Sequence, residues 1–489
     1  RVTGWTSGRR FMWRAAVMSD IAAPAKPRRN IEAVLLVLAL GVGVGANMLV
    51  GIDEDRAFDS DFWVQGGTLV ALVLAFHFVL RFRAKYADPV ILPIVTALNG
   101  IGLAMIHRLD IANGDDAADR QLLWSTVAVA AAIAVMFFIK DHRILRRYTY
   151  ISLIVSALLL LLPLMPGLGQ EINGARIWIN VGFGTFQPGE IAKITLAIFF
   201  AGYLSANRDL ILLAGRKVGP LQLPRFKDMG PMMAAWAVSI GVLVFQRDLG
   251  SSILFFGLFM AMIYVATSRV SWVLIGLALI GAGGFVAVQL FSHVALRIDS
   301  WLNAFDPEVI ARVPGGSFQV VNGLFGLASG GMTGTGLGQG RPDLVTYANS
   351  DMIIAALGEE LGLIGIFAIV LMYVLLVSRG FRAALGTRDG FGKLLACGLS
   401  FTIALQCFVV IGGVTRLIPL TGLTTPFMSA GGSSLLANWI IVALLLLISD
   451  AARRPAATGL PTDMEPALAA PGADRGKTYG KGRNEVAGA

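Results

Sequence analysis

Long apolar runs separated by short polar segments dominate this sequence. A helix needs about 20 mostly apolar residues to cross the hydrocarbon core of a membrane. In lipid a helix satisfies its own backbone hydrogen bonds, so runs of this length are expected to be helical. The pattern therefore predicts an all-α, polytopic integral membrane protein of about twelve transmembrane helices, near residues 31–51, 62–80, 90–106, 121–139, 149–168, 188–205, 231–246, 250–267, 272–291, 352–378, 394–415 and 432–449.

The polar segments between these runs differ in charge. With the N-terminus placed inside, the inner loops carry 17 Lys and Arg residues, whereas the outer loops are longer in total and carry nine. An excess of Lys and Arg marks the cytoplasmic side of membrane helices. We therefore expect both termini to be cytoplasmic.

The composition supports a membrane protein. Hydrophobic residues make up 56% of the chain and charged residues 15%, whereas soluble proteins carry about 25% charged residues. A soluble enzyme, a disordered regulator and an ordinary nucleic-acid binder are excluded, and the net charge of +9 is explained by basic loops and tails. The two cysteines, Cys397 and Cys407, lie in one apolar run, so we expect neither a structural disulfide nor a metal cluster.

The same pattern divides the chain into four segments. A basic cytoplasmic tail (1–30) precedes two N-terminal transmembrane helices (31–89), the transmembrane core (90–450) and a disordered cytoplasmic tail (451–489) rich in Ala, Gly and Pro. The core contains one large outer loop, 292–350. Its glycine-rich stretch, 330–338, is expected to be flexible rather than a nucleotide loop, because no strand precedes it and no Gly-Lys-Ser/Thr follows it.

Ionisable residues inside apolar runs are costly in a membrane and therefore informative. Glu190 and Lys193 are three residues apart and share a helix face, which fits either an internal ion pair or a contact with substrate. Asp351 opens the tenth run at the outer surface, either as a reactive carboxylate or as a helix cap. In a continuous helix Glu359 lies near the face of Asp351 and Glu360 points away, so at least one of these glutamates is expected to have a structural partner.

A second group of polar residues lies in the predicted outer connectors. Asp248 sits in a tight hairpin, where it either caps the following helix or faces a cavity. Arg176, Arg247 and Arg416 supply cations on the same side. Together these residues predict an outward-facing polar cavity, which fits a transporter of a charged solute or an enzyme acting on an anionic, membrane-borne substrate.

Four motifs, in order and on the same predicted side, resemble the SEDS family (shape, elongation, division and sporulation), whose members include RodA and FtsW. The resemblance covers about residues 90–450, and its details look most like actinobacterial RodA proteins. Most members have about ten spans, so the two helices within 31–89 are extra and their role is unknown. The motifs are Asn173-Gly174-Ala175-Arg176-Ile177-Trp178-Ile179 with Gln187-Pro188-Gly189-Glu190-Ile191-Ala192-Lys193, Gln246-Arg247-Asp248-Leu249-Gly250-Ser251, Ser350-Asp351-Met352-Ile353-Ile354-Ala355 with Gly358-Glu359-Glu360-Leu361-Gly362, and the run 419–434.

The chain departs from the family pattern at a few uncharged positions. Arg247 stands where the family usually has Pro, Gly189 where Ser is usual, and Ala430 where Tyr is common. No charged position is lost, so the activity that the resemblance implies is retained as an expectation. Because Arg247 replaces Pro, the family pattern does not predict the backbone geometry of this hairpin.

The resemblance implies a SEDS-type helical bundle acting as a peptidoglycan glycosyltransferase, an inverting hexosyltransferase with an undecaprenyl-diphosphate-linked donor. Such an enzyme polymerises lipid II into glycan strands on the outer face of the bacterial cytoplasmic membrane during cell elongation and shape maintenance. Carried onto this chain, Asp351 is the catalytic base, and Glu359 and Glu360 are structural or line the cavity. The implied substrate-binding residues are Arg176, Trp178, Glu190, Lys193, Arg247, Asp248, Arg416, Ser433 and Ser434.

The resemblance also implies partners. These are the substrate lipid II, membrane lipid and a class B penicillin-binding protein, a transpeptidase; nucleic acid is not expected. No cofactor is certain, and a divalent cation, Mg²⁺ or Mn²⁺, at the departing pyrophosphate stays open.

Two functions of other classes stay open beside the polymerase. A lipid II flippase, or another transporter of a lipid-linked anionic substrate, would form no glycosidic bond. It would need charges buried near the inner as well as the outer ends of the helices, and the sequence shows few near the inner ends. A scaffold that only recruits partners would make Asp351 dispensable.

Overall fold

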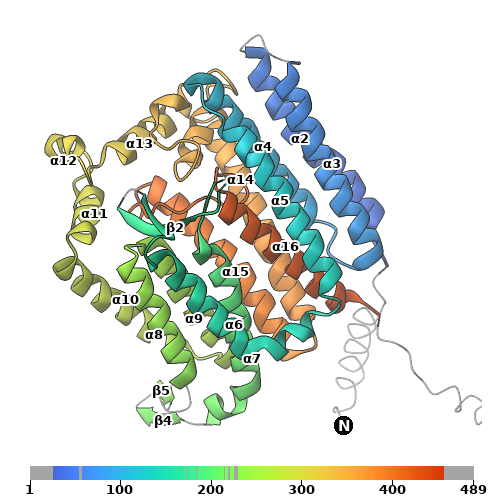
Figure 1. Ribbon diagram of the computed structural model, residues 1–489, viewed down its shortest axis with the longest axis vertical. Coiled ribbons are helices and arrows are strands. Elements are labelled where there is room, and N and C mark those ends of the chain that lie inside the picture. Colours follow the sequence, from blue (N-terminus) through green and yellow to red (C-terminus); the bar gives the residue numbers. More distant parts are fainter. Residues whose placement is uncertain are drawn as a thin grey trace, which may run out of the picture.

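The computed structural model is a tilted bundle of helices (Figure 1). It describes residues 26–53, 58–172, 174–182, 184–213, 215–218, 221–224 and 230–455, so the two predicted tails lie almost entirely outside the described part of the chain. Within that part, eleven helices are long and apolar enough to cross a membrane. They are α2 (Arg29–Asp53), α3 (Ser60–Arg83), α4 (Ile91–Asn113), α5 (Ala117–Phe138), α6 (Thr149–Leu161, extended by a 3₁₀ turn at each end), α7 (Pro188–Leu213), α9 (Leu249–Thr267), α10 (Val270–Leu290), α14 (Ile353–Gly386), α15 (Gly390–Val414) and α16 (Gly432–Arg453).

One of the twelve predicted spans forms a helix that is too short for a full crossing. The apolar run 231–246 forms α8 (Gly230–Phe245), which has 16 residues, fewer than the about 20 that a full crossing needs. α8 packs against α6 and α9. The prediction of an all-α membrane bundle is confirmed, with one predicted span shorter than expected.

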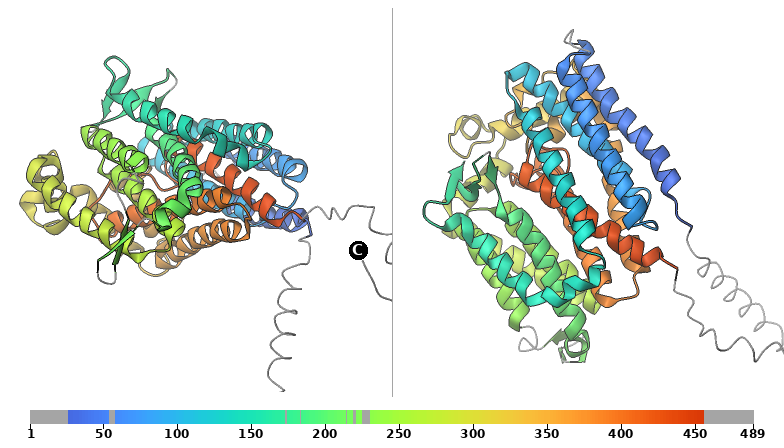
Figure 2. Two further views of the ribbon diagram at one scale, coloured as in Figure 1. Left: turned by 90° about the horizontal axis from the view of Figure 1, so that it is seen from below. Right: turned by 45° about the vertical axis from the view of Figure 1, so that its right-hand side comes forward.

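α4 forms the centre of the bundle. It is apolar on all sides, as expected of a helix with no exposed face, and its most apolar 18-residue window is 100% buried. α2 packs along it, and α3 lies against α2 and α5 (Figure 2). A Cβ atom added at Gly43 of α2 would lie 2.9 Å from the Cα atom of Gly100 of α4. The two extra helices therefore join the bundle through a close, glycine-mediated backbone contact.

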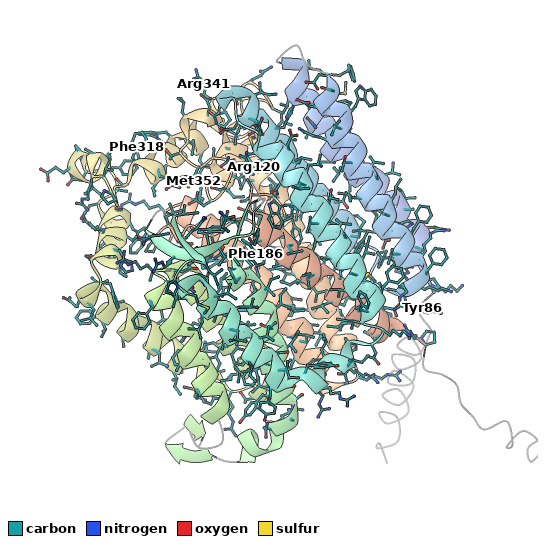
Figure 3. All side chains as sticks on the ribbon, in the orientation of Figure 1. Tyr86, Arg120, Phe186, Phe318, Arg341 and Met352 are labelled. Atoms are coloured by element: carbon teal, nitrogen blue, oxygen red, sulfur yellow. The ribbon has the colours of Figure 1, made fainter. Side chains whose placement is uncertain are left out.

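One end of the bundle, which we call the loop-rich end, holds most of the irregular backbone. A three-stranded antiparallel sheet lies there, formed by β1 (Gly169–Ile172), β2 (Ala175–Asn180) and β3 (Thr185–Phe186). The large loop 292–350 folds over the same end as α11 (Ser292–Leu302), α12 (Pro307–Ala311), α13 (Phe318–Gly330) and a 3₁₀ turn, Pro342–Leu344. Figure 3 shows Phe318, Arg341 and Met352 in this region.

Ion clusters occupy the opposite, basic end, where β4 (Gly215–Val218) and β5 (Leu221–Pro224) form a small hairpin. Glu32 is fully buried and contacts Arg29 and His77, with 2.7 Å between its Oε1 atom and Nδ1 of His77. Asp88 is also fully buried, pairs with Arg453 and lies near Tyr86, the residue labelled at this end in Figure 3. The expectation of few buried charges near the inner helix ends was therefore wrong. The sequence interpretation missed these charges because they lie near or just beyond the ends of the predicted runs rather than at their centres.

Candidate active site

Asp351 lies at the loop-rich end, in the turn that leads into α14. The Nε2 atom of Gln319 donates to both carboxylate oxygens, at 3.2 Å and 3.1 Å, and the hydroxyl of Ser350 donates to Oδ1 at 3.4 Å. Burial raises the pKa of Asp351 to about 6, against the opposing effects of these hydrogen bonds and of the positive charge of Arg297. A carboxylate with this pKa is largely ionised at neutral pH yet able to take up a proton, as a general base must.

The position of Gln319 follows from the packing of α13 on α14. Glycines let the two helices approach closely: a Cβ atom at Gly323 would lie 2.2 Å from Cε of Met352. The first turn of α13 then lies beside the turn that carries Asp351. Gln319 was missed by the sequence interpretation, since nothing in its spacing connects it with a residue 32 positions later.

The connector between α15 and α16 supports the same turn from the other side. The hydroxyl of Ser429 donates to the carbonyl of Ser350 at 2.5 Å, and the Ala430 amide donates to the carbonyl of Asn349 at 2.7 Å. Ser433 and Ser434 begin α16 and are buried. Their partners come from the protein: the Gln187 amide donates to the Ser433 hydroxyl at 2.8 Å, and the Asn438 amide group donates to the Ser434 hydroxyl at 3.2 Å.

Asp248 adopts the capping position that one interpretation predicted. Its Oδ1 atom accepts a hydrogen bond from the Ser251 amide at 2.9 Å, at the N-terminus of α9. Burial raises the pKa of Asp248, opposed by Ser251 and by the charge of Arg297. Arg247, beside it, is exposed and has a left-handed backbone with φ 59°, which explains how the hairpin closes without the Pro usual in the resembled family.

The hairpin also anchors the small sheet. The backbone amide of Arg176 donates to the carbonyl of Gln246 at 3.1 Å. The side chain of Arg176 is exposed on β2, and Trp178 is half-buried on the same strand. Both predicted substrate contacts therefore lie at the loop-rich end, at the rim rather than in the buried part.

Arg297, on α11, interacts electrostatically with the carboxylates of both Asp248 and Asp351. Its Nη1 atom donates to the carbonyls of Leu420 and Thr421 at 3.3 Å and 3.2 Å. Burial lowers the pKa of Arg297, and the negative charges of Asp248 and Asp351 oppose that shift. The sequence interpretation counted Arg297 only as one of nine outer cations, because its neighbourhood depends on how the large loop folds.

Glu190 and Lys193 form a buried ion pair in the first turns of α7. Nζ of Lys193 lies 2.6 Å from Oε2 of Glu190 and donates to Oε1 of Gln406 on α15 at 3.0 Å. Gln406 in turn donates to the carbonyl of Thr424 in the α15–α16 connector at 2.8 Å. This geometry is that of an internal ion pair, the first of the two interpretations that the sequence left open. Through Gln406, the pair connects α7 and α15 to the α15–α16 connector.

Arg416 is engaged with the backbone of the large loop. Its guanidinium donates to the carbonyls of Trp301 and Leu302 at 2.8 Å and 2.7 Å, and it lies 5.3 Å from the centre of the Phe305 ring. Arg416 therefore fastens α11 and the following turn to the end of α15.

Glu359 and Glu360 both bind the large loop, within or just after its glycine-rich stretch. Oε1 of Glu359 accepts from the Arg341 amide at 2.8 Å, and Oε2 of Glu360 accepts from the Gly338 amide at 3.0 Å. Glu360 also pairs with Arg108 of α4, with 3.4 Å between Oε1 and Nε. The expected structural partner is thus present for both glutamates.

Two expectations about this region were wrong. The stretch predicted to be flexible is packed tightly, since a Cβ atom at Gly334 would lie 2.2 Å from the carbonyl oxygen of Glu360. The single continuous helix assumed from Asp351 onward is also incorrect, because α14 begins at Ile353 and has non-helical backbone at Gly362, with φ 67°.

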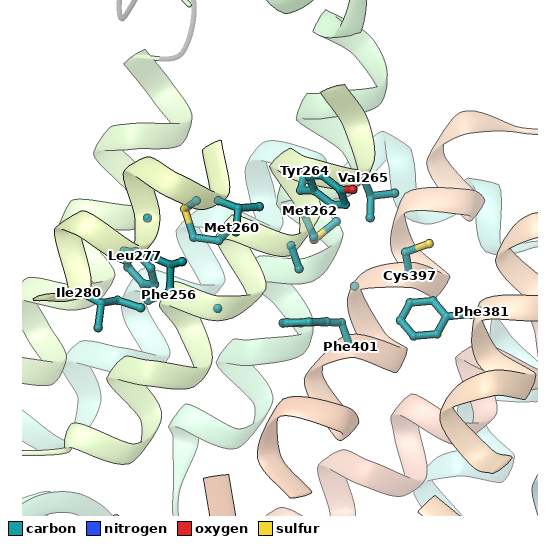
Figure 4. Close-up of a pocket in the computed structure, with 15 residues that line it drawn as sticks. Phe256, Met260, Met262, Tyr264, Val265, Leu277, Ile280, Phe381, Cys397 and Phe401 are labelled. Atoms are coloured by element: carbon teal, nitrogen blue, oxygen red, sulfur yellow. The ribbon is translucent and has the colours of Figure 1, made fainter. Parts of the chain in front are cut away.

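Two further features bear on ligands. Among the described residues, no group of three or more His, Cys, Asp or Glu side chains is arranged to hold a metal ion. An apolar cavity of about 460 Å³ lies between α9, α10, α14 and α15 (Figure 4). Its α9 lining begins at Phe256, about 12 Å along the helix from Asp248, so this cavity is separate from the polar site.

Comparisons with known proteins identify the family of this chain. A family model described as cell cycle protein, of the FtsW, RodA and SpoVE group, matches residues 89–454. Peptidoglycan glycosyltransferase RodA of Mycobacterium tuberculosis is 47% identical over 458 residues, covering 92% of this chain and 96% of that protein. Stage V sporulation protein E of Bacillus subtilis is 35% identical over 382 residues, covering 76% and 99%.

Solved structures show the same fold. A mutant of Thermus thermophilus rod shape determining protein RodA has a TM-score of 0.51 at 24% identity, covering 74% of this chain and 97% of that chain. A chain from a peptidoglycan synthase complex that coordinates polymerization and crosslinking gives the same score and identity and covers 79% and 97%. The family match starts after α3, whereas the mycobacterial match is long enough to include part of α2 and α3. The chain therefore belongs to the family of FtsW, RodA and SpoVE cell cycle proteins.

Proposed function

We propose that this chain is a peptidoglycan glycosyltransferase that polymerises lipid II into glycan strands, serving cell elongation and shape maintenance. The 47% identity with proteins named peptidoglycan glycosyltransferase RodA, over 92% of the chain, supports the activity and the RodA type. The structural observation that carries the proposal is Asp351, a half-buried carboxylate oriented by Gln319 among cations at the loop-rich end.

Asp351 is the general base in this proposal. It takes the proton from the 4-hydroxyl of the acceptor N-acetylglucosamine. The acceptor oxygen then forms a bond to the anomeric carbon of the lipid-linked N-acetylmuramic acid, with inversion. The bond from that carbon to the diphosphate oxygen breaks, and the diphosphate leaves with the electron pair. With a pKa of about 6, about nine-tenths of Asp351 is ionised at pH 7 and ready to accept the proton.

The membrane orientation follows from the loop charges. The basic end carries most of the loop Lys and Arg residues, which supports an orientation with this end and both termini in the cytoplasm. The loop-rich end with Asp351 then faces outward from the bacterial cytoplasmic membrane. Growing glycan strands would be released directly where the cell wall is built.

A transpeptidase partner fits this activity. The relative in the synthase complex is associated with both polymerization and crosslinking, and this chain supplies no second soluble domain for crosslinking within its described residues. We propose that a class B penicillin-binding protein provides that step beside this polymerase.

The buried charges at the basic end keep a lipid II flippase as the second candidate. Glu32 and Asp88 are fully buried there, which meets the requirement that a transporter has charges near both ends of its helices. Their partners, Arg29, His77 and Arg453, are protein side chains, so the clusters also serve to join α2, α3 and α16.

The decisive experiment uses the purified protein in proteoliposomes with labelled lipid II on both leaflets. A polymerase yields a ladder of glycan products on a gel from the outward-facing substrate. A flippase exposes inner-leaflet lipid II to an external probe and yields no polymer. Translocation without polymer would replace the proposed function by the alternative.

A further inference from the structure

We propose that Arg297, together with Arg247, forms the anion-binding half of the active site and holds the diphosphate of the lipid-linked donor next to Asp351. This inference rests on the proposed function and adds to it a residue that the sequence motifs do not contain. It gives the contact with the diphosphate to Arg297 rather than to Lys193 or Arg416, two of the substrate-binding residues that the resemblance implies.

The guanidinium of Arg297 is anchored at one corner. Both of its hydrogen bonds within the described part of the chain leave from Nη1, to the carbonyls of Leu420 and Thr421. A guanidinium has five N–H donors in a planar fork, so Nε and Nη2 keep donors for a ligand. A fork fixed at one nitrogen and open at the others is suited to bidentate binding of a phosphate group.

The charge of Arg297 is not neutralised by a contact ion pair among the described residues. Asp248 and Asp351 act on it electrostatically, but neither carboxylate lies within the 4.0 Å of the ion pairs found elsewhere in the bundle, such as Glu190 with Lys193. A half-buried cation has lost part of its water shell, which costs free energy, and without a carboxylate in contact only the two carbonyl bonds offset that cost. A diphosphate would supply the missing negative charge.

The neighbouring groups are arranged to receive an anion. Arg247 and Arg297 both act electrostatically on His293, which lies one turn before Arg297 on α11. One carboxylate oxygen of Asp248, Oδ1, already accepts a hydrogen bond from the Ser251 amide at the N-terminus of α9. Arg297 therefore shares its electrostatic surroundings with Asp248 and Asp351, and His293 lies within the fields of both Arg297 and Arg247, while Glu190 of α7 acts on Asp248.

The other candidate cations are occupied. Lys193 is 3% exposed and bound by Glu190 and Gln406. Arg416 donates to the carbonyls of Trp301 and Leu302. Lys193 cannot reach a diphosphate without giving up these contacts. The bonds of Arg416 occupy Nε and Nη2 and leave only Nη1, whereas Arg297 keeps both Nε and Nη2 for a ligand beside its two carbonyl bonds.

The test measures diphosphate binding separately from catalysis. Purified full-length protein is titrated with undecaprenyl diphosphate and, as a comparison, undecaprenyl monophosphate. Arg297→Gln is expected to weaken diphosphate binding by about tenfold to a hundredfold, the effect of losing charge-assisted hydrogen bonds, and to affect the monophosphate less. Arg297→Lys, which keeps the charge but not the fork, is expected to give an intermediate loss. The matched control is Arg312→Gln, which removes a cation paired with Asp299 on the same segment and is expected to bind as the wild type does.

The results separate this inference from the proposed function. Arg297→Gln and Arg297→Lys proteins that both bind undecaprenyl diphosphate as tightly as the wild type would overturn the anion-binding role, even if polymerisation were lost. If Arg297→Gln unfolds, the Arg297→Lys protein decides alone, and wild-type affinity in it overturns the inference. A wild-type protein that binds the diphosphate in an Arg297-dependent way but makes no polymer would refute the proposed function and leave this site standing.

Discussion

Replacing Gln319 by Leu tests how the protein sets the pKa of its proposed base. Gln319 donates to both oxygens of Asp351 at 3.2 Å and 3.1 Å, and hydrogen bonds to a charged group contribute about 1.5 to 3 kcal/mol. These bonds are long, so we take the lower bound, which corresponds to about one pKa unit. The bonds stabilise the ionised form, so their loss should move the pKa of Asp351 from about 6 to about 7.

The assay is the initial rate of polymerisation at saturating lipid II between pH 5.5 and 8.5. A base acts only when deprotonated, so the rate falls as the pH drops through its pKa. The variant should match the wild type near pH 8.5 and be about fivefold slower at pH 6. Asn322→Leu, on the same helix with its amide directed to the Leu344 carbonyl, is the control and should leave the profile unchanged. An acid limb that does not move in Gln319→Leu would refute the assignment of Asp351 as the titrating base.

Two further predictions concern stability. Because burial raises the pKa of Asp351 to about 6, the folded protein holds this proton more tightly than the unfolded chain does, and stability falls as the pH rises from about 4 to about 6. Asp351→Asn should therefore raise the thermal unfolding temperature at pH 7.5 and change it little at pH 4; an equal effect at both pH values would contradict this. Arg416→Gln removes two hydrogen bonds to α11 and should lower the unfolding temperature while undecaprenyl diphosphate binding stays near the wild-type level. Lost binding with unchanged unfolding would return Arg416 to the substrate site.

Much of the bundle could be predicted from the sequence because spanning helices leave a direct signal. Each spanning helix needs a long apolar run, and the excess of Lys and Arg in alternate loops indicates which helix ends lie on the same side of the membrane. Asp351 and Asp248 could be named because a carboxylate at the mouth of an apolar run is rare. The resemblance then singled out Asp351, and Asp248 could be recognised as a helix cap.

The remainder depends on tertiary packing that spacing does not encode. Gln319 and Arg297 come to the site only because the large loop folds into α11–α13 and α13 packs closely on α14. Lys193 could not be assigned without its partner Gln406, which is 213 positions away. The directions of Glu359 and Glu360 were misjudged because a uniform helix was assumed from Asp351 onward, whereas α14 begins at Ile353 and both glutamates bind the folded large loop.

The most direct test of the central claim is the yield of glycan polymer from purified lipid II by the Asp351→Asn protein. Asn keeps the size of the side chain and removes its ability to accept a proton. Asp306→Asn is the matched control, because Asp306 is an exposed cap of α12 and Asn caps a helix as well as Asp does. The account predicts no detectable polymer from Asp351→Asn and a wild-type yield from Asp306→Asn. A wild-type yield of polymer from Asp351→Asn would contradict it.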